Sequence, residues 1–150
     1  ALAAACGTAQ PASFTTVTGV YTESSNVTST SPPTATACNR VSFCYVVFNK
    51  VPLGKQLIVT HASCQFNPSA GDVGQMTLLA VRDNGAQVQR LPFLPSSDRP
   101  STTPGKNVIT NSTVLAPFSD KERPIVHLQL TASANILGTC SISGQLVDVP

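Results

Sequence analysis

A histidine and a cysteine lie three residues apart in the stretch LIVTHASCQF, and these two residues are the clearest candidates for catalysis or metal binding in the chain. A cysteine nucleophile needs its histidine base within hydrogen-bond reach of the sulfur. The stretch has the composition of a β-strand, and residues three apart on a strand point to opposite faces of the sheet. His61 can therefore activate Cys64 only if the strand contains a bulge, and we expect no catalytic Cys–His pair.

The same two residues are weak candidates for a metal site. A blue-copper centre needs a cysteine, two histidines and usually a methionine near one loop. Met76 and His127 lie far from Cys64 in the sequence. If the strands around His61 and His127 paired, the two imidazoles and a carboxylate would form a two-histidine site. Lone strand histidines are more often hydrogen-bonded structural residues, so we expect no bound metal and no cofactor.

The acidic and serine residues show no hydrolytic motif. The serine signature GxSxG and the calcium loop DxDxDG are both absent. No spacing singles out the paired carboxylates of a glycosidase, and most carboxylates stand beside turn residues, where they bond to local backbone. We therefore expect a protein that is not an enzyme. The seven carboxylates are Glu23, Asp72, Asp83, Asp98, Asp120, Glu122 and Asp148.

The cysteines favour disulfides instead. Five cysteines in 150 residues are more than a reducing cytosol usually allows, and they fit no zinc template. Cys64 ends one predicted strand and Cys140 begins the last, so we favour a disulfide between them. Cys38 and Cys44 can pair only if the segment between them turns back. Cys6 is then a leftover or intermolecular thiol, and the other pairings stay open.

The first residues, ALAAAC, resemble a signal-peptide cleavage region. They also resemble a bacterial lipoprotein signal, but Leu2 stands four residues before Cys6 instead of three, so we expect no lipid there. With the cysteines, this predicts a secreted, periplasmic or cell-surface protein.

Sequons at Asn26 and Asn111 would accept N-glycans only in a eukaryotic secretory path. No apolar run approaches 18 residues, so we expect no membrane span.

The composition indicates which elements must position these residues. Charged residues make up 11% of the chain, and Ser, Thr, Val and 12 Pro favour strands and turns. About eight short strands predict an all-β fold, namely a two-sheet antiparallel β-sandwich with jelly-roll-like connectivity. Asn84-Gly85 is the strongest hairpin signal, and a turn is expected around Asn135 and Gly138 before the last strand.

The chain also divides by composition. Residues 1–37 are rich in Ser and Thr and nearly uncharged. We expect them to form an ordered N-terminal arm that lies on its own sheet or on a neighbouring copy. Residues 38–150 are expected to form the β-sandwich domain.

Two functions fit these features. The first is a non-catalytic structural or interaction module in a surface, filament, shell or decoration assembly, binding a copy of itself or another surface protein through an added edge strand. The second is a carbohydrate- or ligand-binding module with Asp83, Asn84, Asp98 and Arg99 in its loops, although sugar platforms usually need more exposed aromatics. A net charge of +2 with scattered Lys and Arg argues against nucleic acid.

Overall fold

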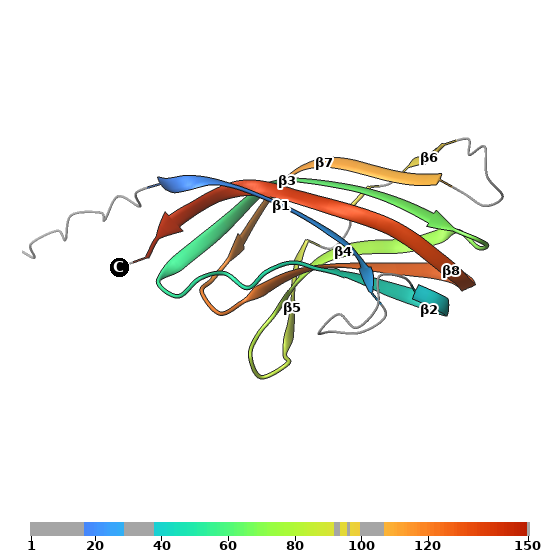
Figure 1. Ribbon diagram of the computed structural model, residues 1–150, viewed down its shortest axis with the longest axis horizontal. Helices are drawn as coiled ribbons and strands as arrows, with labels where there is room; N and C mark the ends of the chain where they lie inside the picture. Colours follow the sequence, from blue (N-terminus) through green and yellow to red (C-terminus); the bar gives the residue numbers. More distant parts are fainter. Residues whose placement is uncertain (1–16, 29–37, 92–93, 96, 100–106, 150) are drawn as a thin grey trace, which may run out of the picture.

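The protein is all-β. The structure, a computed structural model, describes residues 17–28, 38–91, 94–95, 97–99 and 107–149. All strand pairings in it are antiparallel, and they join the strands into one open sheet (Figure 1). The strands are β1 (Val17–Thr28), β2 (Cys38–Val47), β3 (Lys55–Pro68), β4 (Val73–Val81), β5 (Gln87–Leu91), the three-residue β6 (Ser97–Arg99), β7 (Asn107–Phe118) and β8 (Arg123–Asp148).

The 26-residue strand β8 organises the sheet. Its residues 136–148 pair with β1 and β3, whereas residues 123–130 pair with β2 and β4. Between these parts β8 turns back, so that the sheet folds over and its two parts face each other (Figure 1). We call β1, β3, β6, β7 and residues 136–148 the upper half. We call β2, β4, β5 and residues 123–130 the lower half.

The fold of β8 is held at what we call the corner end, made of residues 38–41, 69–72 and 131–135. The Asn135 N–H donates to the Ser69 hydroxyl at 3.0 Å, and the Asn135 carbonyl accepts from the Ser69 N–H at 2.9 Å. Thr131 and Asp72 are joined in the same way, by a backbone bond of 2.9 Å and a side-chain bond of 3.0 Å. The bending strand therefore keeps its backbone groups paired.

The turn predicted around Asn135 and Gly138 is confirmed as a reversal of the chain, since β8 turns back at residues 131–135, but no separate loop is formed and Gly138 lies within the strand. Gly138 is needed for a different reason. A Cβ built on it would lie 2.4 Å from the backbone oxygen of Gln65, so glycine permits the close approach of β3. Gly138 therefore permits strand pairing with β3 and does not form a turn.

The apolar core lies between the two halves, and its largest buried side chains include Phe48, Phe66 and Phe118. In β3 the inward alternation shifts at a bulge between Val59 and His61. Odd-numbered residues are buried before the bulge and even-numbered ones after it. The bulge shifts the alternation by one residue, so β3 keeps one buried face and one outward face on both sides of it.

Two disulfides cross-link the described residues. Cys64 and Cys140 are direct cross-strand partners with Cα atoms 4.0 Å apart, and this is the pairing that the sequence favoured. Its 76-residue separation would stabilise the fold by about 4 kcal/mol in the chain-entropy account. Cys38 and Cys44 are also joined, with Cα atoms 6.2 Å apart, because β2 turns at the corner end. Two disulfides indicate an oxidising compartment.

The remaining fold predictions have different outcomes. The hairpin at Asn84-Gly85 is confirmed, since β4 and β5 pair on either side of it and Gly85 has a φ of 79°. Hydrogen bonding is continuous through β8, so the two-sheet sandwich and its jelly-roll connectivity are not shown.

Within the predicted arm, residues 17–28 form β1 of the chain's own sheet. Cys6 and the rest of residues 1–37 lie outside the described residues, and the boundary at residue 37 stays a prediction.

Candidate functional site

The loop residues predicted to bind a ligand are not brought together. Asp83 and Asn84 lie in the β4–β5 turn of the lower half, where the Asn84 side chain accepts from the Ala86 N–H at 3.0 Å. Asp98 and Arg99 lie in β6, beside the first residues of β7 in the upper half (Figure 1). One loop site that uses all four residues is therefore not formed.

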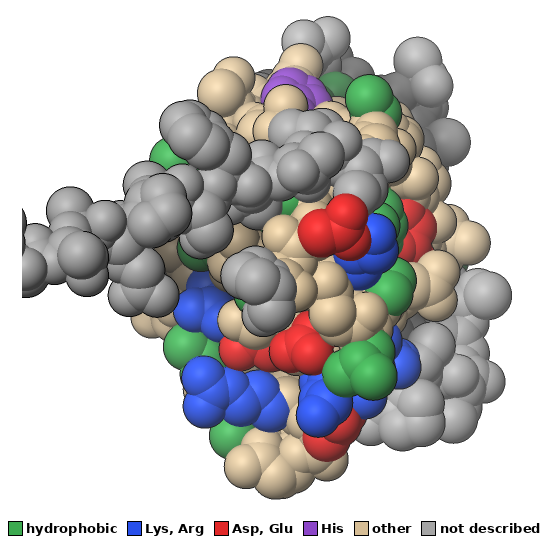
Figure 2. Space-filling view, turned by 90° about the vertical axis from the view of Figure 1, so that its left-hand side faces the viewer, with side chains coloured by type: hydrophobic (Ala, Val, Ile, Leu, Met, Phe, Trp, Pro, Cys, Tyr) green, Lys and Arg blue, Asp and Glu red, His purple; other side chains and the backbone are tan. Residues whose placement is uncertain are grey.

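The charged residues gather instead at one end of the molecule, which we call the charged end and define as residues 48–55, 82–86 and 119–123. Figure 2 shows Lys, Arg, Asp and Glu side chains side by side on this face. Lys50 pairs with Asp83 at 2.5 Å, and Lys55 pairs with Asp148 of the last strand. Sequence reasoning missed this cluster because its members are scattered along the chain.

A buried carboxylate lies at the centre of the charged end. The Glu122 side chain is only 5% exposed; it accepts from Arg90 at 2.5 Å, from Arg82 at 3.2 Å and from the Ser119 N–H at 3.0 Å. Burial alone would raise the pKa of this carboxyl. The Ser119 N–H and the two guanidinium groups outweigh burial and hold the pKa below its ordinary value.

The Glu122 backbone also fastens the neighbouring loops. Its carbonyl accepts from the Val51 N–H at 2.9 Å, and the Lys121 N–H donates back to the Val51 carbonyl at 3.2 Å. Lys121 has a φ of 65°, which is unusual for a residue other than glycine. The network thus joins strands β4, β5 and β8 to the β2–β3 connection.

Cavities surround this network. One of about 380 Å³ is lined by Arg82, Asp83, Asn84, Ser119, Asp120, Lys121 and Glu122. A second, of about 340 Å³, is lined by Lys50, Val81, Arg82, Asp83, Gly85, Lys121 and Arg123. Asp83 and Asn84, two of the predicted ligand residues, therefore line the first cavity, and Asp83 lines both.

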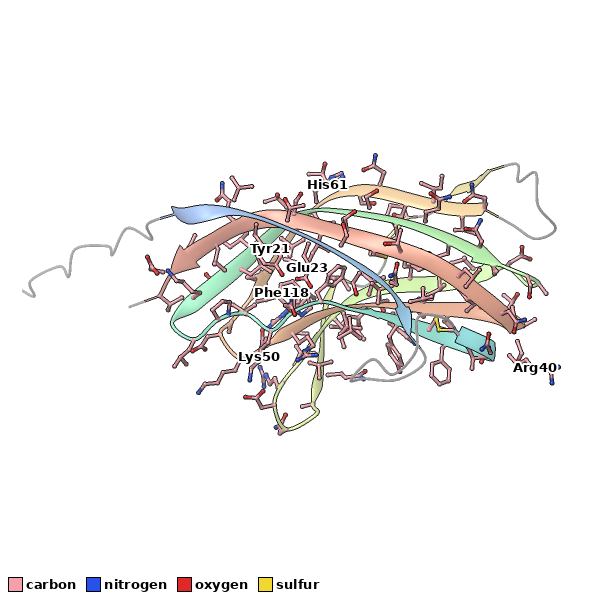
Figure 3. The ribbon with its side chains drawn as sticks, viewed as in Figure 1. Tyr21, Glu23, Arg40, Lys50, His61 and Phe118 are labelled. Carbon is pink, nitrogen blue, oxygen red and sulfur yellow. A yellow bond between two sulfur atoms is a disulfide. The ribbon has the colours of Figure 1, made fainter. Side chains whose placement is uncertain are left out.

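The two histidines lie in different surroundings. His61 is on the outer side of the upper half (Figure 3), while Cys64 faces the core in its disulfide. His127 is half-buried on the lower half and stacks on Tyr45 with ring centroids 5.1 Å apart, beside Phe43. Burial lowers the pKa of His127. The described residues contain no group of three or more His, Cys, Asp or Glu side chains that could hold a metal ion.

The outer face of the upper half carries rows of hydroxyl side chains. Cross-strand pairing aligns residues of β1, β8, β3 and β7 in rows across this face. Two neighbouring rows contain hydroxyl and amide side chains, His61 and no charged residue: Thr22, Ser143, His61 and Thr113, followed by Ser24, Ser141, Ser63 and Asn111. These two rows are therefore polar and uncharged.

Comparison with known proteins identifies no relative. No family model, no curated protein and no solved structure matches the chain. Within the described ranges, no helix has the length and apolarity needed to cross a membrane.

Proposed function

We propose that this protein is a non-catalytic structural or interaction module of a secreted, periplasmic or cell-surface assembly, and that it associates with copies of itself or with another surface protein. The observation that carries the proposal is the uncharged outer edge of β7, where no described strand pairs with residues 110–118. The jelly-roll-like sandwich also belongs to the proposal, supported by the two facing halves that enclose one core.

Within the described part of the chain, the outer edge of β7 is unpaired along most of its length. β6 pairs only with residues 107–109, so no described strand pairs with the outer side of residues 110–118. Natural sheets usually protect such an edge with charged side chains, bulges or a covering element. β7 contains no Lys, Arg, Asp or Glu; only Pro117 has the character of an edge residue. An unprotected edge of this kind favours a partner strand.

The opposite edge of the upper half is β1, which is complementary in direction. β1 pairs with β8 on one side, and along Val17–Asn26 no described strand lies on its other side. The order β1–β8–β3–β7 is antiparallel throughout, so β1 and β7 run in opposite directions. The β1 edge of one copy can therefore extend the sheet of the next copy at β7, again antiparallel. Repeated head-to-tail, this contact gives a polymer.

Both edges carry an exposed apolar side chain on the outer face. Val20 of β1 is 88% exposed and Leu115 of β7 is 73% exposed. Val20 shares a row across the sheet with Gln145, Ile58 and Pro117, and Leu115 lies two residues from Pro117. Strand addition would cover both side chains, and apolar burial adds to the main-chain hydrogen bonds.

The test is native mass spectrometry on protein purified without reductant, comparing wild type with Leu115→Lys and Val20→Lys. We expect an oligomeric wild type and two monomeric variants. Leu53→Lys is the matched control, because Leu53 is 75% exposed but lies at the charged end, away from both edges. The proposal would be contradicted by a monomeric wild type. It would also be contradicted if Leu53→Lys lost assembly as completely as the two edge variants.

Mixing the two variants sharpens this test. Each retains one intact edge, Leu115→Lys at β1 and Val20→Lys at β7. A head-to-tail contact therefore predicts that the mixture forms a one-to-one heterodimer and nothing larger. A contact between two identical edges would instead leave the mixture without heterodimers.

The aromatic side chains of the lower half favour a second candidate function, carbohydrate binding. Phe43, 46% exposed, lies edge-on to Tyr45 at 5.8 Å between ring centroids, and His127 contacts both rings to complete a cluster of three. Sugar rings bind to such aromatic surfaces. A glycan array with wild type and Phe43→Ala tests this function. Binding should be weaker in the variant. If the wild type bound no glycan on the array, carbohydrate binding would be excluded.

A further inference from the structure

We propose that the second cavity of the charged end binds the oxyanion group of a small acid, such as a carboxylate or a sulfate, with Lys121 and Arg123 as its principal contacts. The inference does not depend on the proposed assembly, because the cavity lies away from both sheet edges. It follows from the balance of charge in the cavity, from which charges are already paired and from the backbone at Lys121.

The lining of this cavity is strongly positive. Lys50, Arg82, Lys121 and Arg123 face one carboxylate, that of Asp83, which leaves a lining charge of +3. The whole chain has a net charge of only +2. The rest of the protein is therefore slightly negative, and the positive charge is concentrated at this cavity. Clefts with walls of one sign raise the local concentration of the oppositely charged ligand.

Two of the four cations already have partners. Lys50 is paired with Asp83 at 2.5 Å, and Arg82 is paired with the buried Glu122 at 3.2 Å. The carboxylate of Asp120, in the adjoining cavity, lies 3.4 Å from the Gly54 N–H. Lys121 and Arg123 form no ion pair with any residue in the described part of the chain. Two unpaired cations beside one cavity are available to an oxyanion.

The backbone keeps these two cations in place. Arg123 begins β8 and is the cross-strand partner of Val81, which also lines the cavity. Lys121 has a φ of 65°, a left-handed conformation that glycine adopts at lower cost. A non-glycine residue at a strained position points toward a function for its side chain. The positive charge of Lys121 at the cavity is such a function.

The size of the cavity indicates more than a bare ion. Its volume of about 340 Å³ lies within the usual range for small-molecule sites. An inorganic ion would fill only part of it. We therefore infer a ligand of about the size of an organic acid or an acidic monosaccharide, with its oxyanion at Lys121 and Arg123.

The experiment is an amide NMR titration of the full chain at low ionic strength, with sodium sulfate, glucuronate and uncharged glucose as probes. Saturable shifts with sulfate or glucuronate, at residues 50, 82–85 and 121–123, would support the site. No saturable shift with either anion would overturn it, and so would equal binding of glucose and glucuronate.

Two matched variants separate a specific site from general attraction. Lys121→Gly and Arg40→Gly each remove one positive charge and place glycine at a positive φ. Lys121 lines the cavity beside Lys50, whereas Arg40 lies at the corner end, far from Lys50 in Figure 3. We expect about ten-fold weaker anion binding in Lys121→Gly and unchanged binding in Arg40→Gly. Equal weakening in both variants would overturn the proposal. Neither variant alters β1 or β7, so their oligomeric state reports on the proposed assembly separately.

Discussion

At the corner end the chain turns back through backbone hydrogen bonds and a disulfide, whereas at the charged end three loops are joined by ion pairs around one buried carboxylate. Arg40 and Lys50 in Figure 3 lie toward these two ends. The corner end uses contacts that depend little on pH or salt. The charged end uses contacts that depend on both. One folded sheet therefore separates an end held by contacts that are insensitive to charge from an end whose ion pairs depend on pH and salt.

The largest expected effect is at the charged end. Glu122→Gln should lower the free energy of unfolding by about 3 kcal/mol, because it leaves the Arg82 and Arg90 guanidinium groups without their buried partner. Denaturant unfolding measures this loss. The matched control is Asp148→Asn at the exposed Lys55 pair, where the loss should be less than about 1 kcal/mol. Equal losses in the two variants would show that Glu122 does not organise this end.

The next effect is at the corner end. Replacing Cys38 and Cys44 together by serine should cost about 2 kcal/mol, since a cross-link across six residues restrains the unfolded chain less than a long one does. Chemical denaturation under non-reducing conditions measures it. A cost above that of Glu122→Gln would mean that the corner end, and not the charged end, contributes more to stability.

Acid should weaken the charged end through Glu122. The pKa of Glu122 is lowered in the folded protein, so the unfolded chain takes up the proton first as the pH falls. The stability from this group is complete above its unfolded pKa of about 4.3 and is lost as the pH drops below that value. Unfolding curves from pH 6 to pH 3 should therefore fall more steeply for wild type than for Glu122→Gln. Parallel curves would contradict the account.

The smallest effect compares the two positive-φ residues. Arg40→Gly and Lys121→Gly should each raise stability by about 0.5 kcal/mol, since the strain relieved slightly exceeds the added flexibility of the unfolded chain. Thermal unfolding measures both. A clear loss of stability in Lys121→Gly alone would show that its side chain stabilises the fold instead of serving a ligand.

Much of the fold was predictable from local chemistry. The alternation of apolar residues indicated the strands, and Asn84-Gly85 indicated the hairpin because few residues adopt the positive φ that its turn requires. The favoured pairing of Cys64 with Cys140 rested on the ends of two strands. The predicted turn was confirmed as the reversal of β8 beside Asn135, but Gly138 lies within the strand because the backbone of β3 closely approaches it.

The candidate site was less predictable. Asp83 and Asn84 were chosen for their turn, but Lys121, Glu122 and Arg123 were not, since each looked like an ordinary loop charge. They become neighbours of Asp83 only because β8 begins beside the end of β4.

From the sequence we could predict the all-β class and a weakly charged, polar composition, and the cysteines indicated an oxidising compartment. These properties depend on composition and on periods of two residues, which are local. The folding over of β8, the contact of Cys38 with Cys44 and the placement of Lys121 and Arg123 at one cavity follow from tertiary packing. Such features depend on which distant strands pair, and their registers are set by packing between segments many residues apart.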